Sequence, residues 1–359
     1  MKNHSEYLPY GAENISFDTI KIRISMKKIG VNGFGRIGRY FTRMSLEQKT
    51  VDVAVVNDLA DIQTLAHLFK YDSVHRQIKH EFSVEGDHLL FDNGKKIIFT
   101  QHESPENIPW RDYGIDYVLE STGLFRTAAD ASKHFEGGAQ KVIISAPGQG
   151  GAIKSVVLGV NDELLEREDR LISNASCTTN SAAPMVKVIK ELCSIESAYI
   201  TTVHSYTSDQ KLHDAPHKDL RRARAAAQSI VPTTTGAAKA LTKIFPELDG
   251  HMGGCGIRVP VPDGSLTDLT ITVKGKAPTV KDINNQFEKA SQNELRDILA
   301  YTNEPLVSSD IIGNPHSCIF DSQLTSVVGN LVKLVGWYDN EAGYSNRLID
   351  LIKKMDAWD

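Results

Sequence analysis

Residues 27–44 read KKIGVNGFGRIGRYFTRM. The apolar beginning of this stretch, KKIGVN, predicts a short buried strand. Gly33, Gly35 and Gly38 follow in the pattern G-x-G-x-x-G, and apolar side chains then recur at helical spacing over residues 36–48. A glycine turn between a strand and a helix is typical of a dinucleotide site, where glycine allows the turn, the approach of a pyrophosphate and the packing of helix against strand. The alternative is a tight turn that binds nothing.

An acidic residue stands where such a site needs one. A second strand is predicted at 51–56, and Asp58 follows it, 20 residues after Gly38. A carboxylate there can accept hydrogen bonds from a ribose diol and repels a 2′-phosphate, which favours NAD. The alternative is that Asp58 caps the next helix, predicted at 61–70.

Strands and helices alternate through the rest of the first half. Further strands are predicted at 82–84, 96–99, 117–120 and 142–145, and a helix at 127–135. The first two of these strands are expected to form a hairpin around Asp92-Asn93-Gly94. The alternation predicts an α/β fold with a Rossmann-type, doubly wound parallel sheet.

The second half has a different pattern. Helices are predicted at 178–193, 234–244 and 344–355, and strands at 197–204, 256–261, 266–273, 317–320 and 331–338. Extended runs with long connections, including a polar and basic stretch at 205–229, predict an α+β domain with a mixed or antiparallel sheet. We expect the last helix to pack back on the first half.

The composition is that of a globular protein of about two domains. Of its 359 residues, 41% are hydrophobic and 24% charged, which argues against a disordered, collagenous or coiled-coil chain. A run of about 18 apolar residues is absent, so no spanning helix is predicted. The net charge of −5 gives no overall attraction to nucleic acid or anionic membranes. The four cysteines are scattered, which indicates a reducing compartment and no metal site.

Cys177 is the cysteine with a reactive setting. It starts a predicted helix in SNASCTTN, residues 173–180, and a helix N-terminus lowers the pKa of a thiol. His204 ends the following strand and could reach that N-terminus as a base and later an acid. The alternative is a small buried cysteine without a chemical role.

Basic and hydroxyl side chains gather in the second half. Arg222 belongs to a basic cluster at 211–224, which could be a solvated loop, a nucleic-acid patch or a phosphate site. Thr235 and Gly236 precede a predicted helix and could bind a second anion. Arg258 lies in a predicted strand, where an isolated charge usually has a partner or a ligand.

The chain resembles the phosphorylating glyceraldehyde-3-phosphate dehydrogenase family from about Lys27 to Met355. The motifs that carry the resemblance are NGFGRIGR, SNASCTTN, TTVHSYT, HKDLRRARAAA, PTTTGAAKA and WYDNEAGYS, in family order. It implies oxidation of glyceraldehyde 3-phosphate to 1,3-bisphosphoglycerate with NAD, through a thioester on Cys177, with His204 as base and acid.

The resemblance also implies a set of binding residues. For the cofactor these are Gly33, Gly35, Arg36, Ile37, Gly38, Asp58, Ser121, Thr122, Ser145, Asn340 and Tyr344. For the substrate phosphate they are Thr207, Arg222 and Arg258, and for inorganic phosphate Ser176, Thr178, Thr235 and Gly236. The 205–229 stretch resembles a loop that crosses to a neighbouring subunit's cofactor, which implies a homotetramer.

Some residues depart from the family pattern. Ser181 replaces a second cysteine that often follows the nucleophile, and Glu103 replaces a basic residue often found near the adenine. Ala215, where NAD-preferring bacterial forms often have leucine, leaves some tolerance for NADP.

Two other functions stay open on the same scaffold: erythrose-4-phosphate dehydrogenase, and a non-catalytic RNA-binding role. We expect a cytoplasmic enzyme with glyceraldehyde 3-phosphate and phosphate as partners, and neither a membrane nor nucleic acid as a primary partner. The expected domains are 27–176, completed by a C-terminal helix at 341–359, and 177–340. Residues 1–26 are expected to be a disordered extension, or to reflect an upstream start site.

Overall fold

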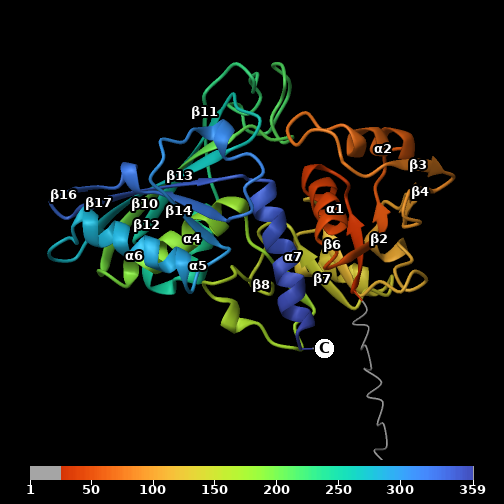
Figure 1. Ribbon diagram of the computed structural model, residues 1–359, viewed down its shortest axis with the longest axis horizontal. Coiled ribbons are helices and arrows are strands. Elements are labelled where there is room, and N and C mark those ends of the chain that lie inside the picture. Colours follow the sequence, from red (N-terminus) through yellow and green to blue (C-terminus); the bar gives the residue numbers. More distant parts are fainter. Residues whose placement is uncertain (1–25, 359) are drawn as a thin grey trace, which may run out of the picture.

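The computed structural model describes residues 26–358 of the chain, built around two β-sheets (Figure 1). The expectation for the N-terminal extension therefore lies almost wholly outside the described residues. The strands of the first sheet are β1 (Lys28–Asn32), β2 (Asp52–Asn57), β3 (Phe82–Glu85), β4 (His88–Phe91), β5 (Lys96–Thr100), β6 (Tyr117–Glu120), β7 (Lys141–Ile144), β8 (Lys154–Ser155) and β9 (Leu171–Ser173).

The centre of this sheet is parallel and doubly wound, as predicted. Its order is β3-β4-β5-β2-β1-β6-β7-β9-β8, and the strands from β5 to β8 pair in parallel. The strand order reverses between β1 and β6, and ligands of such sheets bind outside the carboxyl ends of the strands at this point. The fold therefore places a crevice directly beyond Asn32 and Glu120.

Both faces of this sheet are buried because residues of one strand alternate between two core clusters. Tyr117 and Leu119 of β6 pack in the cluster that holds α1 (Arg36–Gln48) and α2 (Ile62–Lys70), while Val118 packs with Trp110 on the other face. The helix predicted at 127–135 is split into α3 (Ala128–Ser132) and a 3-10 turn over Lys133–Phe135.

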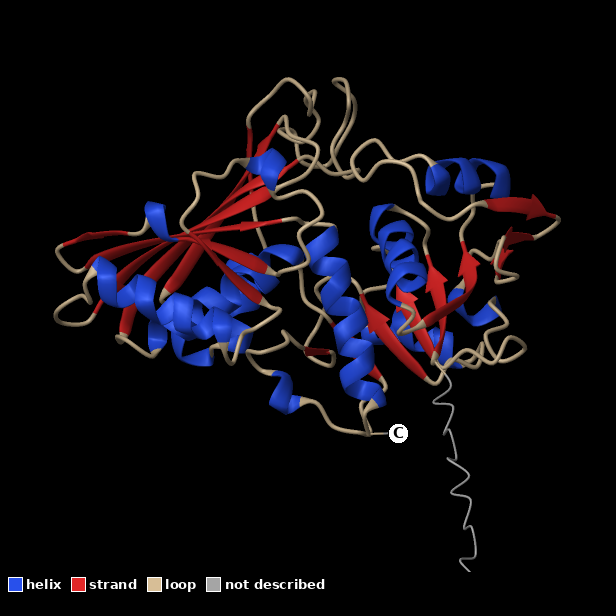
Figure 2. Cartoon of the chain, in the orientation of Figure 1, coloured by secondary structure: helices blue, strands red, loops and turns tan. Residues whose placement is uncertain are grey.

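The second sheet is mixed, as expected for the α+β half. Its strands are β10 (Ile195–Ser205), β11 (Val231–Thr233), β12 (Met252–Val259), β13 (Ser265–Val273), β14 (Leu299–Thr302), β15 (Cys318–Asp321), β16 (Ser326–Val328) and β17 (Leu331–Tyr338). They run in the order β11-β12-β10-β13-β17-β15-β14, with β16 beside β17. Helices α4 (Cys177–Lys190), α5 (Ala237–Ile244) and α6 (Val280–Gln292) lie along one side of it (Figure 2).

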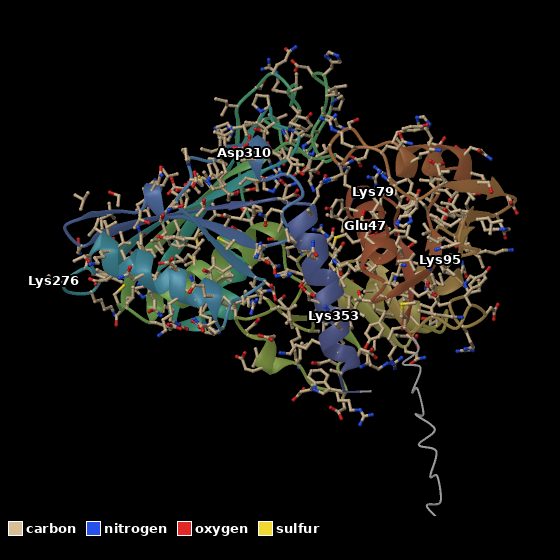
Figure 3. The ribbon with its side chains drawn as sticks, in the orientation of Figure 1. Glu47, Lys79, Lys95, Lys276, Asp310 and Lys353 are labelled. Carbon is tan, nitrogen blue, oxygen red and sulfur yellow. The ribbon has the colours of Figure 1, made fainter. Side chains whose placement is uncertain are left out.

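The last helix, α7 (Ala342–Asp356), stands between the two sheets beside α1 (Figure 1). Leu348, Ile352 and Met355 of α7 are buried in the same core cluster as Ile29 and Phe41. Charged side chains such as Lys276 and Lys353 lie on the outside of the molecule (Figure 3). Within residues 26–358, no helix combines the length and the apolar character that a bilayer crossing requires.

The structure also differs from the predicted elements at β4 and α6, and the short strands β8, β9, β11, β14 and β16 were not predicted. The hairpin predicted from 82–84 and 96–99 is wrong, because β4 lies between these strands and pairs with both. The chain reverses direction at Gly86, which has a φ of +60°, and this turn joins β3 to β4. Helix α6 was not predicted, because only Ile283, Phe287 and Ala290 of its 13 residues are buried.

Candidate active site

The three glycines of the first turn have three different surroundings. Gly33 has a φ of +93°, and a Cβ there would lie 2.7 Å from the backbone nitrogen of Thr122. A Cβ on Gly38 would lie 2.2 Å from the carbonyl oxygen of Gly33, so this glycine lets helix α1 pack against the turn. A Cβ on Gly35 would meet no atom of the described residues within 4 Å. Gly35 therefore borders open space, as expected where a ligand approaches the backbone.

Helix α1 begins at this open space without a side-chain cap, since its N-cap is Gly35 itself. The N–H groups of its first turn therefore remain available to an anion, with the positive end of the helix dipole behind them. The turn fits a pyrophosphate by this geometry as well as by its sequence.

Asp58 faces the turn rather than capping a helix. Its two carboxylate oxygens accept the backbone N–H groups of Phe34 at 2.7 Å and Ala60 at 3.0 Å. The cap of α2 is Asp61, whose side chain accepts from Thr64 N–H. The capping alternative for Asp58 is therefore wrong.

Asp58 lines a cavity of about 290 Å³ together with the glycine turn. Two apolar side chains of this cavity, Leu59 and Leu124, were not predicted from the sequence, and they are 62% and 75% exposed. Large exposed apolar side chains beside a polar pocket suit the flat faces of an aromatic ligand. The signal in the sequence was a leucine directly after the acidic residue that follows β2.

A larger groove of about 620 Å³ continues from this cavity toward Cys177, and Gly35, Ser121 and Thr122 line both. The other predicted cofactor residues that line the groove are Arg36, Ile37, Ser145, Asn340 and Tyr344. Of the predicted cofactor set, Gly38 alone lines neither space, because it lies beneath the turn.

The side chains at the far end of the groove are held in place by hydrogen bonds. Asn340 Oδ1 accepts from the hydroxyls of Ser205 at 2.8 Å and Ser265 at 2.7 Å. Both bonds go to the amide oxygen, and among residues 26–358 the amide nitrogen of Asn340 has no hydrogen-bond partner, so it can donate into the groove. The hydroxyl of Tyr344 donates to the carbonyl of Ala175, close to the nucleophile helix.

The side chain of Arg36 is held by two carboxylates. Its guanidinium donates to both carboxylate oxygens of Glu341 and to both of Asp72. These ion pairs and their hydrogen bonds raise the pKa of Arg36 in spite of its burial. Its side chain therefore joins α1 to the segment before α7, and the N–H groups of the turn remain available to an anion.

Cys177 and His204 lie together at the end of the groove. Ser176 caps α4 by accepting from Thr179 N–H at 3.1 Å, so Cys177 is the first helical residue. Ala175 before it has a left-handed φ of +53°, which turns the chain sharply into the helix. The Sγ of Cys177 is 3.5 Å from Nε2 of His204, which stands near the end of β10.

The prediction of a lowered thiol pKa is wrong. Burial raises the pKa of Cys177, and it outweighs the positive charge of Arg258 and the N–H of Thr178, which lower it. Burial, together with the charge of Arg258, lowers the pKa of His204 to about 3. His204 is therefore a neutral imidazole at pH 7, and it can take a proton at Nε2 in the tautomer whose Nδ1–H donates to the Ser205 carbonyl at 2.8 Å.

A third space, of about 190 Å³, opens beside the two reactive side chains. It is lined by the predicted anion residues Ser176, Thr178, Arg222, Thr235, Gly236 and Arg258. Thr207 lines the larger groove instead, and Arg258 lines both spaces. The structure thus groups Arg222 with Thr235 and Gly236, whereas the resemblance implied Thr207 as its companion.

Known proteins are similar to this chain over most of its length. The family model for the NAD-binding domain of glyceraldehyde 3-phosphate dehydrogenase matches residues 27–128, and that for the C-terminal domain matches residues 176–340. The glyceraldehyde-3-phosphate dehydrogenase of Mycobacterium avium is 52% identical over 331 residues, which cover 90% of this chain and 97% of the relative. The enzyme of the same name from Geobacillus stearothermophilus is 51% identical over 326 residues, covering 90% and 96%.

Proposed function

The chain belongs to the glyceraldehyde-3-phosphate dehydrogenase family, and from this premise we propose that it oxidises D-glyceraldehyde 3-phosphate with NAD and inorganic phosphate to 1,3-bisphosphoglycerate. It is an NAD-dependent oxidoreductase that acts on an aldehyde. The observation that carries the proposal is the Cys177–His204 contact of 3.5 Å, at the meeting point of a dinucleotide-sized groove and a small anion-binding space.

The first half of the reaction forms a thioester on Cys177. His204 takes the thiol proton at Nε2, and the thiolate attacks the aldehyde carbon. The resulting oxyanion receives that proton and becomes a hemithioacetal hydroxyl, with the N–H groups at the start of α4 stabilising the charge in between. His204 then accepts the hydroxyl proton as the carbon is oxidised. Bound NAD would supply the nicotinamide ring that takes up the hydride from this carbon.

The second half transfers the acyl group to phosphate. Ser176, Thr178, Arg222, Thr235 and Gly236 line the space beside the sulfur and would hold inorganic phosphate there. An oxygen of that phosphate attacks the thioester carbon, the C–S bond breaks, and Cys177 leaves as a thiolate. Arg258 and Thr207 would bind the phosphate that the substrate already carries.

The residues proposed to hold NAD extend along the groove. The cavity with Asp58 would take the adenosine, with its ribose on the carboxylate, and the N–H groups of the glycine turn would take the pyrophosphate. Asn340 would donate to the nicotinamide carboxamide, with Tyr344 near the ring, and Ser121, Thr122 and Ser145 would line the path between. Asp58 favours NAD, and Ala215 leaves some tolerance for NADP.

Two variants test the assignment of the thiol and its base. Cys177→Ser should lower NAD reduction by about three orders of magnitude or more, while the Kd for NAD stays within about twofold. Near wild-type turnover of Cys177→Ser would overturn the mechanism. His204→Asn should slow alkylation of Cys177 by iodoacetamide at neutral pH, and unchanged alkylation would contradict its role as base.

Omission of phosphate separates this function from hydrolysis of the acyl enzyme, the reaction expected of an erythrose-4-phosphate dehydrogenase. NAD reduction should stop after one equivalent per active site when phosphate is omitted. Neither that alternative nor an RNA-binding role is favoured by the family comparisons.

We extend the proposal to the organisation of the protein. The dinucleotide domain would comprise residues 27–176 completed by the C-terminal helix, and the catalytic domain residues 177–340. A homotetramer in the cytoplasm, in which the 205–229 loop reaches a neighbouring subunit, suits the exposed apolar side chains of that loop, Leu212 and Leu220. Light scattering after gel filtration tests the tetramer.

A further inference from the structure

Glu120 is a carboxylate that the reaction does not use, and it is 1% exposed. It ends β6, at the reversal of strand order where the cofactor crevice opens. Its Oε1 accepts Thr122 N–H at 2.9 Å and the Thr122 hydroxyl at 2.5 Å. Its Oε2 accepts Asn32 Nδ2 at 2.6 Å and His134 Nε2 at 3.0 Å. Four donors therefore surround one buried carboxylate.

The protonation of His134 follows from its other neighbour. Trp110 Nε1 can only donate, and it lies 3.0 Å from Nδ1 of His134, so Nδ1 is an acceptor. The proton of the neutral ring is then on Nε2, and it points to Glu120. His134 and Trp110 are both fully buried. His134, which accepts from Trp110, thus donates to Glu120 from the side away from the crevice.

On the side of the crevice, the same carboxylate orients two amides in series. Asn32 donates to Glu120 through Nδ2, and its Oδ1 accepts from Asn57 Nδ2 at 2.8 Å. The Oδ1 of Asn57 in turn accepts the Thr100 hydroxyl at 3.0 Å and His102 N–H at 2.9 Å. A continuous set of hydrogen bonds thus crosses the carboxyl ends of β6, β1, β2 and β5, which are neighbours in the sheet.

This set of hydrogen bonds lies along the wall of the Asp58 cavity. Asn32, Asn57, His102 and Thr122 all line that cavity. The bonds from Thr122 to Glu120 also fix the turn that carries Leu124, whose N–H donates to the Thr122 hydroxyl at 3.0 Å. The Glu120 carboxylate therefore fixes residues of the cavity wall through hydrogen bonds, although Glu120 itself does not line the cavity.

Burying a charged side chain costs desolvation free energy, so it stabilises a sheet poorly. A carboxylate loses its hydration on burial, and an apolar side chain of similar size often gives equal or greater stability. What a carboxylate adds is direction, because each oxygen holds its donors at a set angle and distance. We propose that Glu120 is a positioning residue for the adenosine end of the cofactor groove, where it orients Asn32 and Thr122. This inference rests on the proposed function, which places NAD in that groove.

Glu120→Gln tests the proposal by binding as well as by activity. Whichever way the new amide turns, its NH₂ group faces two donors, so either Thr122 or the Asn32–His134 side loses its acceptor. We expect the Kd for NAD and the Kd for ADP-ribose, both measured by calorimetry, to rise by about tenfold or more. At saturating NAD, kcat should stay within about threefold, and the rate of Cys177 alkylation without NAD within about twofold.

A matched variant controls for loss of stability. Asp321 is another buried carboxylate, which accepts Trp337 Nε1 at 3.0 Å and Gln323 N–H at 3.1 Å and lines neither the groove nor the Asp58 cavity. Asp321→Asn should lower the melting temperature and leave both Kd values unchanged. An unchanged Kd in Glu120→Gln, or an equal rise in Asp321→Asn, overturns the proposal.

Two variants of His134 decide the question if Glu120→Gln does not fold. His134→Gln can still donate to Glu120 and accept from Trp110, so its Kd for NAD should stay within about twofold of wild type. His134→Leu removes both bonds and should raise the Kd by about fivefold or more. Equal affinities of these two variants would overturn the proposal. Failure of the wild-type protein to bind NAD would instead overturn the proposed function.

Discussion

Arg36 and Glu341 form a two-pronged ion pair, in which Nε and Nη2 of the arginine donate to the two carboxylate oxygens at 2.7 and 2.5 Å. The residues are 305 positions apart in the chain. Arg36 opens α1 directly after the glycine turn, and Glu341 lies between Asn340 and α7. The pair therefore ties the phosphate end of the groove to the segment that carries Asn340.

Breaking this pair should destabilise the protein. Arg36→Met removes the guanidinium from the carboxylates of Glu341 and Asp72, which keep His75 and two backbone N–H groups as neighbours. We expect the free energy of unfolding in urea to fall by about 2 kcal/mol. This is less than for a fully buried pair because Arg36 is 28% exposed. Lys190→Met, which removes an exposed ion pair with Glu247, should cost less than about 0.5 kcal/mol. Equal losses in the two variants would contradict a special role for Arg36.

Two glycine substitutions in the first turn should affect different properties, one the affinity for NAD and the other the stability of the fold. Gly35→Ala adds a methyl group to open space, so stability should change by less than about 0.5 kcal/mol while the Kd for NAD rises at least about tenfold. Gly38→Ala drives its methyl group into the Gly33 carbonyl and should cost about 2 kcal/mol. Thermal unfolding and NAD titration of both variants check this. A stable Gly38→Ala protein would show that the turn can shift.

Cofactor preference should depend on the charge of Asp58. Asp58→Asn keeps an oxygen that can accept from Phe34 N–H but loses the charge that repels a 2′-phosphate. The ratio of kcat/KM for NAD to that for NADP should fall by about tenfold or more. Asp61→Asn, at the cap of α2, should leave the ratio unchanged. An unchanged ratio in Asp58→Asn would show that neighbouring residues set the preference.

The position of Arg222 predicts which phosphate it binds. Its Nε donates to Thr233 at 2.9 Å, and it lines the space with Thr235 and Gly236 rather than with Thr207. Arg222→Met should therefore raise the KM for inorganic phosphate by about tenfold or more and change the KM for the aldehyde little. Steady-state kinetics with each substrate varied in turn measures both constants. The opposite result would favour the grouping that the family resemblance implied.

Asp263 should make the protein less stable as the pH rises. It is fully buried next to Asp339 and Glu341, and burial and these negative charges raise its pKa. In the unfolded chain the carboxyl ionises near its ordinary pKa of 3.8. Raising the pH above about 4 therefore favours the unfolded state until the raised folded pKa is passed.

Asp263→Asn removes this proton and should remove the penalty. We expect its melting temperature to exceed that of wild type by about 3 °C or more at pH 8, and by less at pH 5. Glu47→Gln, on the exposed side of α1, serves as the control and should show no such trend. A difference for Asp263→Asn that stays constant from pH 5 to pH 8 would show that Asp263 keeps the same protonation in both states.

Local sequence determined much of this fold. The boundaries of α1 at Arg36 and Gln48 were predicted correctly, because glycine and apolar spacing act over a few residues. The doubly wound sheet followed from the alternation of strands and helices. Helix α6 was missed because its narrow buried face, Ile283, Phe287 and Ala290, is weak next to its many polar residues. Strand β4 was missed because two close reversals resemble one hairpin.

Like the fold, the functional site was predicted from the sequence only in part. The pattern of the sequence singled out Cys177, His204 and Asp58, since each follows a strand or begins a helix at a recognisable place. Only the tertiary structure decided that burial of Cys177 outweighs the helix N-terminus in setting its pKa, that Arg36 pairs with Glu341, and that Arg222 lies beside Thr235. These properties depend on which distant groups share a small volume, and desolvation and ion pairing act through space rather than along the chain.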